Sequence, residues 1–237
     1  MGTLQILEKT PSLAGLEPEI LTRMASSATT RTLNRGELLW QAGDPAKSFT
    51  ILRSGLVKVV RPAPKGRSAI CGIFGPPESV GDLALLKDSP YPADAVVATE
   101  SATIVQIPRA MMMEAMRQAP NLATSVAAGM WSKLSALHNK IDVLSAGSVE
   151  ARLATLLIKL YEQFGDDFDD DTSKILVTLS RRELADLVST SFETAIRVMS
   201  RWDREGVLET NSDGFTIHKL DVLRDVAGVG DSGETAA

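Results

Sequence analysis

Two charged side chains near the C-terminal end of the chain have the types and spacing that suit base recognition. Glu193 and Arg197 are four residues apart, so in a helix they lie on the same face. An arginine guanidinium can donate two hydrogen bonds to guanine O6 and N7, and a glutamate can accept one from cytosine N4. The pair therefore predicts a helix that reads one or two neighbouring G·C pairs in the major groove of DNA.

The residues around this pair predict two helices joined by a tight turn. Ser180 with Glu183 three residues later fits a capping box at the start of the first helix. The turn is expected at residues 189–191, and the second helix from about Phe192 to Glu205, where Gly206 ends it. The next segment is hairpin-like and completes a winged helix-turn-helix: VLETNSDGFTIHK.

The first residues of the second helix in such a motif point into the major groove. We expect Phe192, Glu193, Thr194 and Arg197 at the bases, and Arg181, Arg182, Arg201 and Arg204 on phosphates. Ser191 in the turn is also expected to bind DNA. Two other interpretations are open. Thr190 and Glu193 also fit a capping box, and Glu193 with Arg197 also fits an ordinary surface ion pair.

A long helix is predicted from Pro120 to about Ser145. Its apolar residues are spaced alternately by four and three, which is the heptad pattern of a two-helix seam: Ala123, Ala127, Met130, Leu134, Leu137, Ile141 and Leu144. We expect this helix to join two copies of the chain in a homodimer. The alternative is that the stripe is the buried face of a helix in a monomer.

The rest of the chain divides by its residue patterns. Residues 1–30 have helical spacing, residues 32–107 alternate short apolar runs with turn residues as in an antiparallel β-roll, and Pro108 opens a helix. We expect a hinge at residues 145–148, a helix over VEARLATLLIKLYEQF, and a strand at ILVTL. The acidic run GDDFDDD could suggest a metal site, but it lacks the alternation and glycine of an EF-hand, so we expect a solvated loop.

These patterns give an α+β protein with four segments. The predicted segments are a β-roll sensor domain at 1–118, a dimerisation helix and hinge at 119–146, a winged helix-turn-helix at 147–226, and a disordered tail at 227–237.

The composition limits the kinds of site and the classes of function that the chain can have. The single cysteine, Cys71, excludes an internal disulfide and an iron–sulfur cluster held by four cysteines of one chain. The net charge of −5 gives no global basic signal, so DNA binding would need a local basic patch. The sequence shows no signal peptide and no membrane span, which predicts a cytoplasmic location. With two histidines and no recognisable nucleophile–base pair, no enzyme activity is expected, and His218 is interpreted as a surface residue.

The order of these segments resembles the cyclic AMP receptor protein / fumarate–nitrate reductase regulator family. The resemblance rests on GELLWQAGDPAKSFTILRSGLVKV, VGDLALL, the long helix, VEARLATLLIKL, and the Glu193, Thr194 and Arg197 core. It implies a cyclic-nucleotide-binding-type β-roll, a homodimer, an inverted-repeat site in double-stranded DNA, and RNA polymerase as a partner. The alternative function is a regulatory subunit of an enzyme that uses the same β-roll.

The chain departs from the members that bind cyclic AMP. Gly81 is retained and Asp82 replaces a glutamate, but Pro92 and Ala93 stand where the family has the arginine and serine that bind the phosphate. Neither can neutralise a phosphate or donate a side-chain hydrogen bond to it. Leu137 and His138 replace the small hydroxyl residues that touch the nucleotide base. We therefore expect an effector other than cyclic AMP.

Phe192 replaces an arginine of the cyclic-AMP-type regulators. An apolar side chain at this position can contact a thymine methyl group. The chain is therefore more similar to the branch that reads TTGA-like half-sites than to the one that reads TGTGA.

The resemblance implies a single effector pocket. The residues expected around it are Gly81, Asp82, Leu137, His138 and Cys71, the last of these in a core strand. Haem, with His138 as the iron ligand, is the leading hypothesis, since neutral imidazole is a common haem ligand. The alternatives are an unknown small organic ligand, or no ligand with control by abundance or by Cys71 oxidation. His138 also fits an exposed residue bonded to Asp142, and Cys71 also fits a small core hydrophobe.

Overall fold

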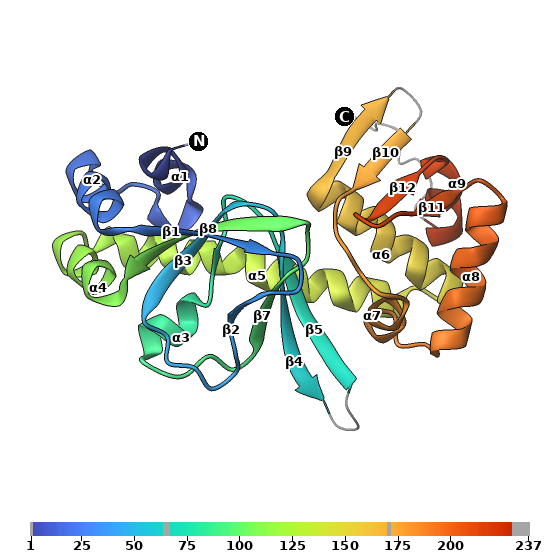
Figure 1. The fold of residues 1–237 in the computed structure, drawn as a ribbon, viewed down its shortest axis with the longest axis horizontal. Helices are drawn as coiled ribbons and strands as arrows, with labels where there is room; N and C mark the ends of the chain where they lie inside the picture. Colours follow the sequence, from blue (N-terminus) through green and yellow to red (C-terminus); the bar gives the residue numbers. More distant parts are fainter. Residues whose placement is uncertain (1, 64–66, 170–171, 229–237) are drawn as a thin grey trace, which may run out of the picture. The chain divides into compact units, whose positions relative to one another are not determined.

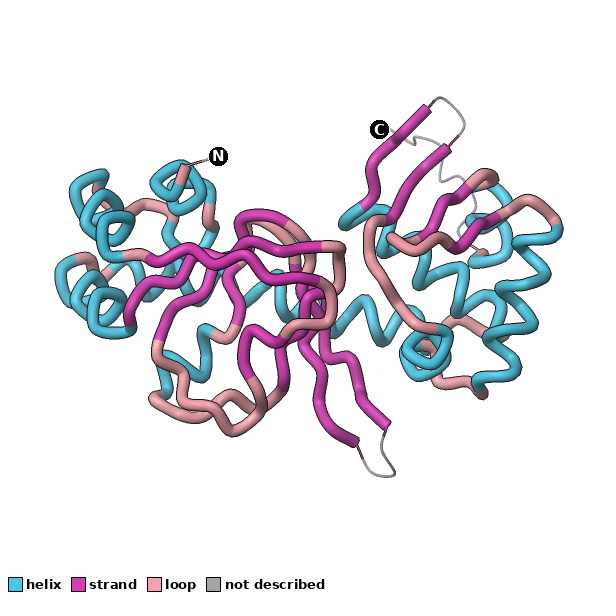
Figure 2. Tube along the Cα trace, viewed as in Figure 1, coloured by secondary structure: helices cyan, strands magenta, loops and turns pink. Residues whose placement is uncertain are grey.

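A computed structural model describes residues 2–63, 67–169 and 172–228 of the chain (Figure 1). The described chain forms two compact units, residues 1–136 and 137–237. The boundary falls inside the long helix α5, so the predicted dimerisation segment is shared between the units instead of forming a third one. Both units combine helices with antiparallel sheet, which confirms the α+β prediction (Figure 2).

The first unit contains two four-stranded antiparallel sheets. One has the order β1-β8-β3-β6, formed by β1 (Thr29–Asn34), β8 (Ser101–Pro108), β3 (Ser48–Ser54) and β6 (Ser79–Val80). The other has the order β2-β7-β4-β5, formed by β2 (Leu38–Trp40), β7 (Asp94–Val97), β4 (Val57–Ala63) and β5 (Arg67–Phe74). The antiparallel β-roll predicted for residues 32–107 is confirmed.

Aliphatic side chains fill the core of this unit. Phe49, Ile51, Ile104 and Ile107 on the central strands β3 and β8 are fully buried, and the strands pair over most of their length. Because the core strands are Val- and Ile-rich with few aromatics, the roll depends on branched side chains that suit a pleated surface.

Short helices flank the sheets. They are α1 (Thr3–Lys9), the 3-10 helix η1 (Pro11–Leu13), α2 (Pro18–Ser27), α3 (Asp82–Lys87) and α4 (Arg109–Gln118). The helical spacing of residues 1–30 and the helix after Pro108 are confirmed. In Figure 1, α2 and α4 lie near each other at one end of the β1-β8-β3 sheet, and both contact β8.

The helix α5 (Asn121–Ser145) packs one face on the first unit. Leu122 and Val126 are buried, and Ser125 Oγ donates a 2.7 Å hydrogen bond to the backbone carbonyl of Ala14. A Cβ atom at Gly129 would lie 2.4 Å from Ser12 Oγ, so a larger residue would require the Ser12 side chain to shift. The N-terminal segment is therefore held directly against the long helix.

The second unit places a small sheet beside several helices. Its helices are the end of α5, α6 (Val149–Phe164), α7 (Arg181–Leu187), α8 (Phe192–Arg204) and α9 (Leu220–Ala227). Its sheet has the order β11-β12-β10-β9, from β11 (Leu208–Thr210), β12 (Phe215–Ile217), β10 (Thr172–Ile175) and β9 (Gly165–Asp169). Helix α6 packs on α9 and α8, and buries its predicted leucine face.

Two sequence predictions in this unit are wrong. Residues 165–169 of the acidic run form strand β9 instead of a loop, because pairing with β10 satisfies their backbone groups despite the poor strand propensity of aspartate. The next strand is Thr172–Ile175, so only the first residue of ILVTL belongs to it. Residues 170–171 of the acidic run, and residues 229–237 of the predicted tail, lie outside the described residues.

None of the helices that the structure describes is both long enough and apolar enough to cross a membrane.

Candidate DNA-binding surface and effector cassette

The capping box at the start of α7 forms as predicted. Ser180 Oγ accepts a hydrogen bond from the backbone N–H of Glu183, and the Glu183 carboxylate accepts one from the backbone N–H of Ser180 at 2.8 Å. Two backbone donors that the helix leaves unpaired are thereby satisfied. Leu184 and Ala185 are buried beneath the helix, which fixes its position in the unit.

Ser191 caps the start of α8. Its Oγ accepts a hydrogen bond from the backbone N–H of Thr194 at 3.2 Å, and lies 3.0 Å from the Thr194 hydroxyl. The cap is therefore Ser191 and not Thr190, which corrects the alternative capping box. The hydroxyl groups of Ser191 and Thr194 therefore bond to each other at the start of the helix.

The inner face of α8 anchors the helix. Its buried side chains are Ala195, Val198, Met199 and Trp202, and the sequence predicts all four to be buried. Gly206 follows the helix in a left-handed conformation with φ of +63°, which agrees with its predicted role as the stop. The outer face, with the charged side chains, is left toward solvent.

Three of the side chains predicted to read bases are exposed near the beginning of α8, and Thr194 is partly buried. Phe192 is 39% exposed, and Glu193 and Arg197 are also exposed. Among the ion pairs of the described residues, none joins Glu193 to Arg197. Both side chains are therefore free of the surface pair that the sequence left open.

The arginines predicted on phosphates have different surroundings. Arg201 is paired with Glu150 of α6, and this hydrogen bond raises the pKa of Arg201, while its contact with a phosphate stays a prediction. Arg181 is half-buried; burial lowers its pKa and the charge of Asp203 opposes this shift. Arg182 is exposed, and its guanidinium carbon lies 5.5 Å from the centroid of the Phe192 ring.

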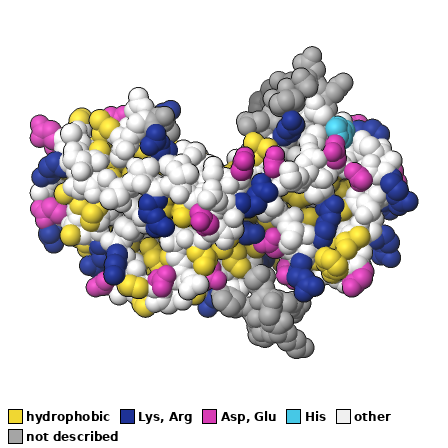
Figure 3. Space-filling view, viewed as in Figure 1, with side chains coloured by type: hydrophobic (Ala, Val, Ile, Leu, Met, Phe, Trp, Pro, Cys, Tyr) yellow, Lys and Arg dark blue, Asp and Glu magenta, His cyan; other side chains and the backbone are white. Residues whose placement is uncertain are grey.

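The hairpin after α8 forms the predicted wing. Strands β11 and β12 pair with Thr210 opposite Phe215, and Asn211 Nδ2 donates a 2.9 Å hydrogen bond to Thr216 Oγ1 near the turn. His218 is exposed, as predicted, with Nε2 3.6 Å from Glu209. Figure 3 shows one face of this unit, where Lys and Arg side chains alternate with acidic ones.

The cassette of the first unit begins at Gly81, which has a φ of +78°. A Cβ atom there would lie 2.6 Å from the Tyr91 ring and 3.1 Å from the Trp40 ring. These two rings stack with centroids 4.1 Å apart. The aromatic pair therefore closes over the glycine and fills the space beside it.

Asp82 is deeply buried, at 2% exposed. Its carboxylate accepts a 2.7 Å hydrogen bond from Ser79 Oγ, which in turn lies 3.0 Å from Ser12 Oγ. The ammonium of Lys133 on α5 pairs with the same carboxylate. Lys133 was not predicted, because nothing in the spacing of the α5 seam marks it as the partner of a carboxylate 51 residues away.

The two positions expected to lack phosphate-binding groups do lack them. Pro92 is exposed, and Ala93 is buried with its backbone carbonyl accepting a 3.1 Å hydrogen bond from Trp40 Nε1. The backbone carbonyl of Ala93 thus holds Trp40 in the aromatic pair. Neither residue offers a charge or a side-chain donor to an anion.

The residues predicted around the effector are divided between the two units. Cys71 is exposed on β5, with Sγ 3.7 Å from the carbonyl of Ala69, so the prediction of a core position is wrong. The thiol is therefore exposed to solvent and does not lie in the core. Leu137 and His138 belong to the second unit and are exposed. Asp142, the alternative partner of His138, pairs instead with Lys159 at 2.9 Å.

Haem binding by His138 stays a prediction. Haem binding needs an axial ligand inside an apolar pocket, whereas His138 is exposed. The described part of the chain also has no group of three or more His, Cys, Asp or Glu side chains arranged to hold a metal ion.

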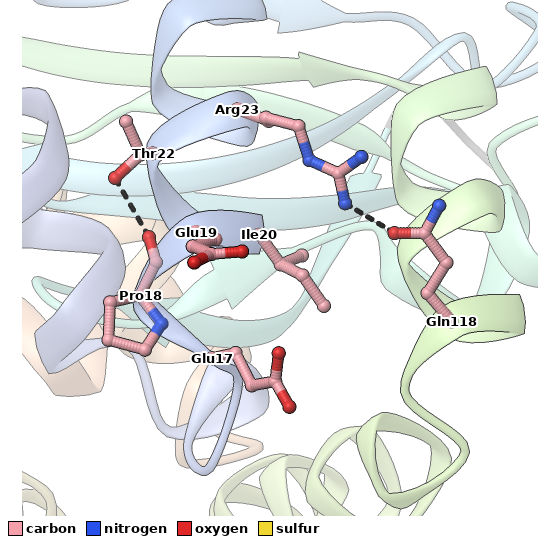
Figure 4. Close-up of a pocket in the computed structure, with 7 residues that line it drawn as sticks. All are labelled: Glu17, Pro18, Glu19, Ile20, Thr22, Arg23 and Gln118. Carbon is pink, nitrogen blue, oxygen red and sulfur yellow. Dashed lines mark hydrogen bonds between the residues drawn. The ribbon is translucent and has the colours of Figure 1, made fainter.

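A surface hollow of about 590 Å³ lies between α2 and the end of α4 (Figure 4). Arg23 reaches across it to the side-chain carbonyl of Gln118, and Thr22 Oγ1 donates to the backbone carbonyl of Pro18 at 2.8 Å. The other lining residues are Glu17, Glu19 and Ile20. None of the residues predicted around the effector lines it.

Two protein families match the chain. The cyclic nucleotide-binding domain matches residues 30–119, and the Crp-like helix-turn-helix domain matches residues 151–226. Their boundaries agree with the β-roll and with the segment from α6 to α9.

Similar proteins of known name share this organisation. The chain is 27% identical to a cyclic AMP receptor protein of Thermus thermophilus over 93% of this chain and 98% of the relative. It is 28% identical to the transcriptional activator protein Anr of Pseudomonas aeruginosa, over 81% of this chain and 77% of the relative.

A solved structure extends the similarity to the fold. A CRP-family transcriptional regulator from Thermus thermophilus is 26% identical, with a TM-score of 0.67 over 84% of this chain and 96% of that one. A β-roll of the cyclic nucleotide-binding type, a long helix and a Crp-like helix-turn-helix in this order identify the chain as a DNA-binding transcription regulator of the cyclic AMP receptor protein / fumarate–nitrate reductase regulator family.

Proposed function

We propose that the chain acts as a homodimer that binds an inverted repeat in double-stranded DNA and controls transcription from it. The observation that carries this proposal is the start of α8, where Ser191 caps the helix and leaves Phe192, Glu193 and Arg197 exposed within its first two turns. A recognition helix presents its first residues to base edges in the same way. Contact with RNA polymerase at the bound promoter is part of the proposal.

The outer face of α5 supports the homodimer. The seam residues Ala123, Ala127, Leu134, Leu137, Ile141 and Leu144 are exposed in the single chain, and Met130 is half-buried. Exposed apolar residues in an unbroken heptad pattern are typical of a helix that pairs with a second copy. This exposure argues against the seam being the buried face of a monomer helix.

Selection from random duplexes tests DNA recognition. The purified chain should enrich an inverted repeat whose half-sites lie about one helical turn, or roughly 10 base pairs, apart. Each half-site should contain a G·C pair for Arg197 and a thymine for Phe192. Failure to enrich any duplex above an unselected pool would refute sequence-specific binding, and would favour a regulatory subunit of another protein.

We further propose that the effector, if one acts, is not a cyclic nucleotide. Pro92 and Ala93 offer no group to a phosphate, and Asp82 is already paired with Lys133. Titration with cyclic AMP and cyclic GMP should leave the affinity for the selected duplex unchanged. Tightening of the complex by either nucleotide at millimolar concentration would overturn this part of the proposal.

Haem stays a prediction from the sequence alone. The absorption spectrum of the protein purified from cells, and again after incubation with haem, tests it directly. A stoichiometric Soret band that His138→Ala shifts or removes would support His138 as the ligand. Unchanged spectra in that variant would remove His138, and absence of stoichiometric uptake would remove haem.

A further inference from the structure

The two neighbouring arginines at the start of α7 differ in their surroundings. Arg181 is half-buried and feels the charge of Asp203. Arg182 is exposed and, within the part of the chain that the structure describes, has no ion-pair partner. Its guanidinium lies over the Phe192 ring at 5.5 Å, a separation at which a cation is attracted to an aromatic face.

This contact joins the two helices of the motif at their first turns. Arg182 is the second residue of α7, and Phe192 is the first residue of α8. Both helix starts are fixed by caps, the first through Ser180 and the second through Ser191. Because the two backbones are held, the contact between the side chains restricts the direction of the Phe192 ring.

In this contact, both side chains keep surface that DNA can contact. A guanidinium that stacks through its plane keeps the N–H donors at its edge available for a phosphate. The Phe192 ring, which is 39% exposed, keeps apolar surface that can contact the methyl group of a thymine. One contact can therefore link backbone binding to base readout.

We propose that Arg182 is a positioning residue for sequence readout, which holds the Phe192 ring in the orientation that contacts a thymine methyl group. Removing Arg182 then weakens the preference for thymine, and not only the overall affinity. This inference rests on the proposed DNA-binding function, and it adds a second role to the phosphate contact predicted for Arg182.

Substitution of uracil for thymine tests the inference, since uracil lacks the C5 methyl and keeps the base pairing. Each thymine of the selected half-site is replaced in turn, and the affinity ratio between the thymine and uracil duplexes is measured for the wild type. The position that Phe192 reads is the one at which Phe192→Ala brings this ratio close to one. At this position Arg182→Ala should lower the ratio roughly two- to five-fold.

Two further variants separate positioning from charge. Arg182→Met keeps a long side chain without a cation and should behave as Arg182→Ala does. Arg224→Ala is the matched control, because Arg224 is exposed on α9, outside the two helices of the motif, and has no predicted contact with DNA. It removes the same charge and should leave the ratio unchanged.

The outcomes distinguish this inference from the proposed function. If Arg182→Ala weakens both duplexes equally and reduces the salt slope by about one, Arg182 is a phosphate contact only and the inference is wrong. A ratio that survives Phe192→Ala at every thymine also overturns it. If the wild type enriches no duplex at all, the proposed function itself fails.

Discussion

Arg197 and Arg201 lie one turn apart on α8 and have different partners. Arg197 is exposed, and no ion pair of the described residues includes it, whereas Arg201 is paired with Glu150 of α6. The sequence places both on the same helix face, and only the packing of α6 against α8 separates them. The first is available for a base, and the second holds two helices together.

Arg197→Ala should weaken binding to the selected duplex by about 1–3 kcal/mol, because a forked contact with guanine is lost. The variant should also accept other pairs at one position of each half-site. Repeating the duplex selection with the variant measures this change. A consensus identical to that of the wild type would mean that Arg197 does not read a base.

Arg201→Ala should leave the salt slope of DNA binding unchanged, since its guanidinium is used by Glu150. The free energy of unfolding should fall by less than about 1 kcal/mol, because the pair is partly exposed to solvent. Glu150→Ala should have a similar effect, and the double variant should lose little more than either single one. A slope reduced by about one would support the prediction of a phosphate contact.

Lys133→Met removes the partner of a buried carboxylate. Asp82 is 2% exposed, so leaving its charge unpaired should lower the free energy of unfolding by about 3 kcal/mol. Thermal or urea unfolding measures the loss. Lys87→Met is the control, because Lys87 is exposed on α3, the same helix that carries Asp82. Equal stability of the two variants would show that the pair does not support the fold.

At the scale of the elements, several predictions that depend on residues close together in the sequence were correct. The Ser180 cap, the stop at Gly206, the α5 heptads and the β-roll strands all formed where their patterns predicted. These signals depend on residues a few positions apart along the chain. The recognition helix and its exposed residues could therefore be placed before the structure was known.

Features that depend on distant partners were missed. Strand β9 forms because β10 lies beside it, and the pairing outweighs the preference of Asp166 and Asp167 for loops. Cys71 lies at a register shift of β5 against β4, where Val59 pairs with Gly72 and Val60 with Ile70, and the sequence could not show this bulge. The Asp82–Lys133 pair joins two elements of the first unit that lie far apart in the chain.

Gly81→Ala tests how the cassette is built. The positive φ disfavours a side chain, and the new Cβ would lie 2.6 Å from Tyr91, which is buried in its stack with Trp40. The strain should lower the free energy of unfolding by about 1–3 kcal/mol, seen as a lower Tm. Gly147→Ala, where no atom lies within 4 Å of the added Cβ, is the control and should change the Tm little.

At the scale of the whole molecule, the exposed stripe of α5 predicts the oligomeric state. Leu137→Glu should convert the dimer to a monomer, because a dimer would bury the charge unpaired at a cost of several kcal/mol. Leu137 is half exposed in the single chain, at 50%, so the unfolding of the monomer should change little. Sedimentation velocity at micromolar concentration measures the change.

Ala128→Glu is the matched control for this experiment. It adds the same charge to an exposed position of α5 that lies off the heptad seam. The variant should remain dimeric. A wild type that sediments as a monomer, with DNA binding intact, would refute the seam.

The pair between Asp82 and Lys133 also sets a threshold for any molecule that would use the cassette. The lysine ammonium is tethered to the same chain, so its effective concentration at the carboxylate is far above that of a free metabolite. An incoming ligand would have to displace it and leave the ammonium without its buried partner. If this displacement costs about 3 kcal/mol, the apparent affinity of the ligand falls by roughly a hundredfold. Any ligand of the Asp82 carboxylate would thus compete with Lys133.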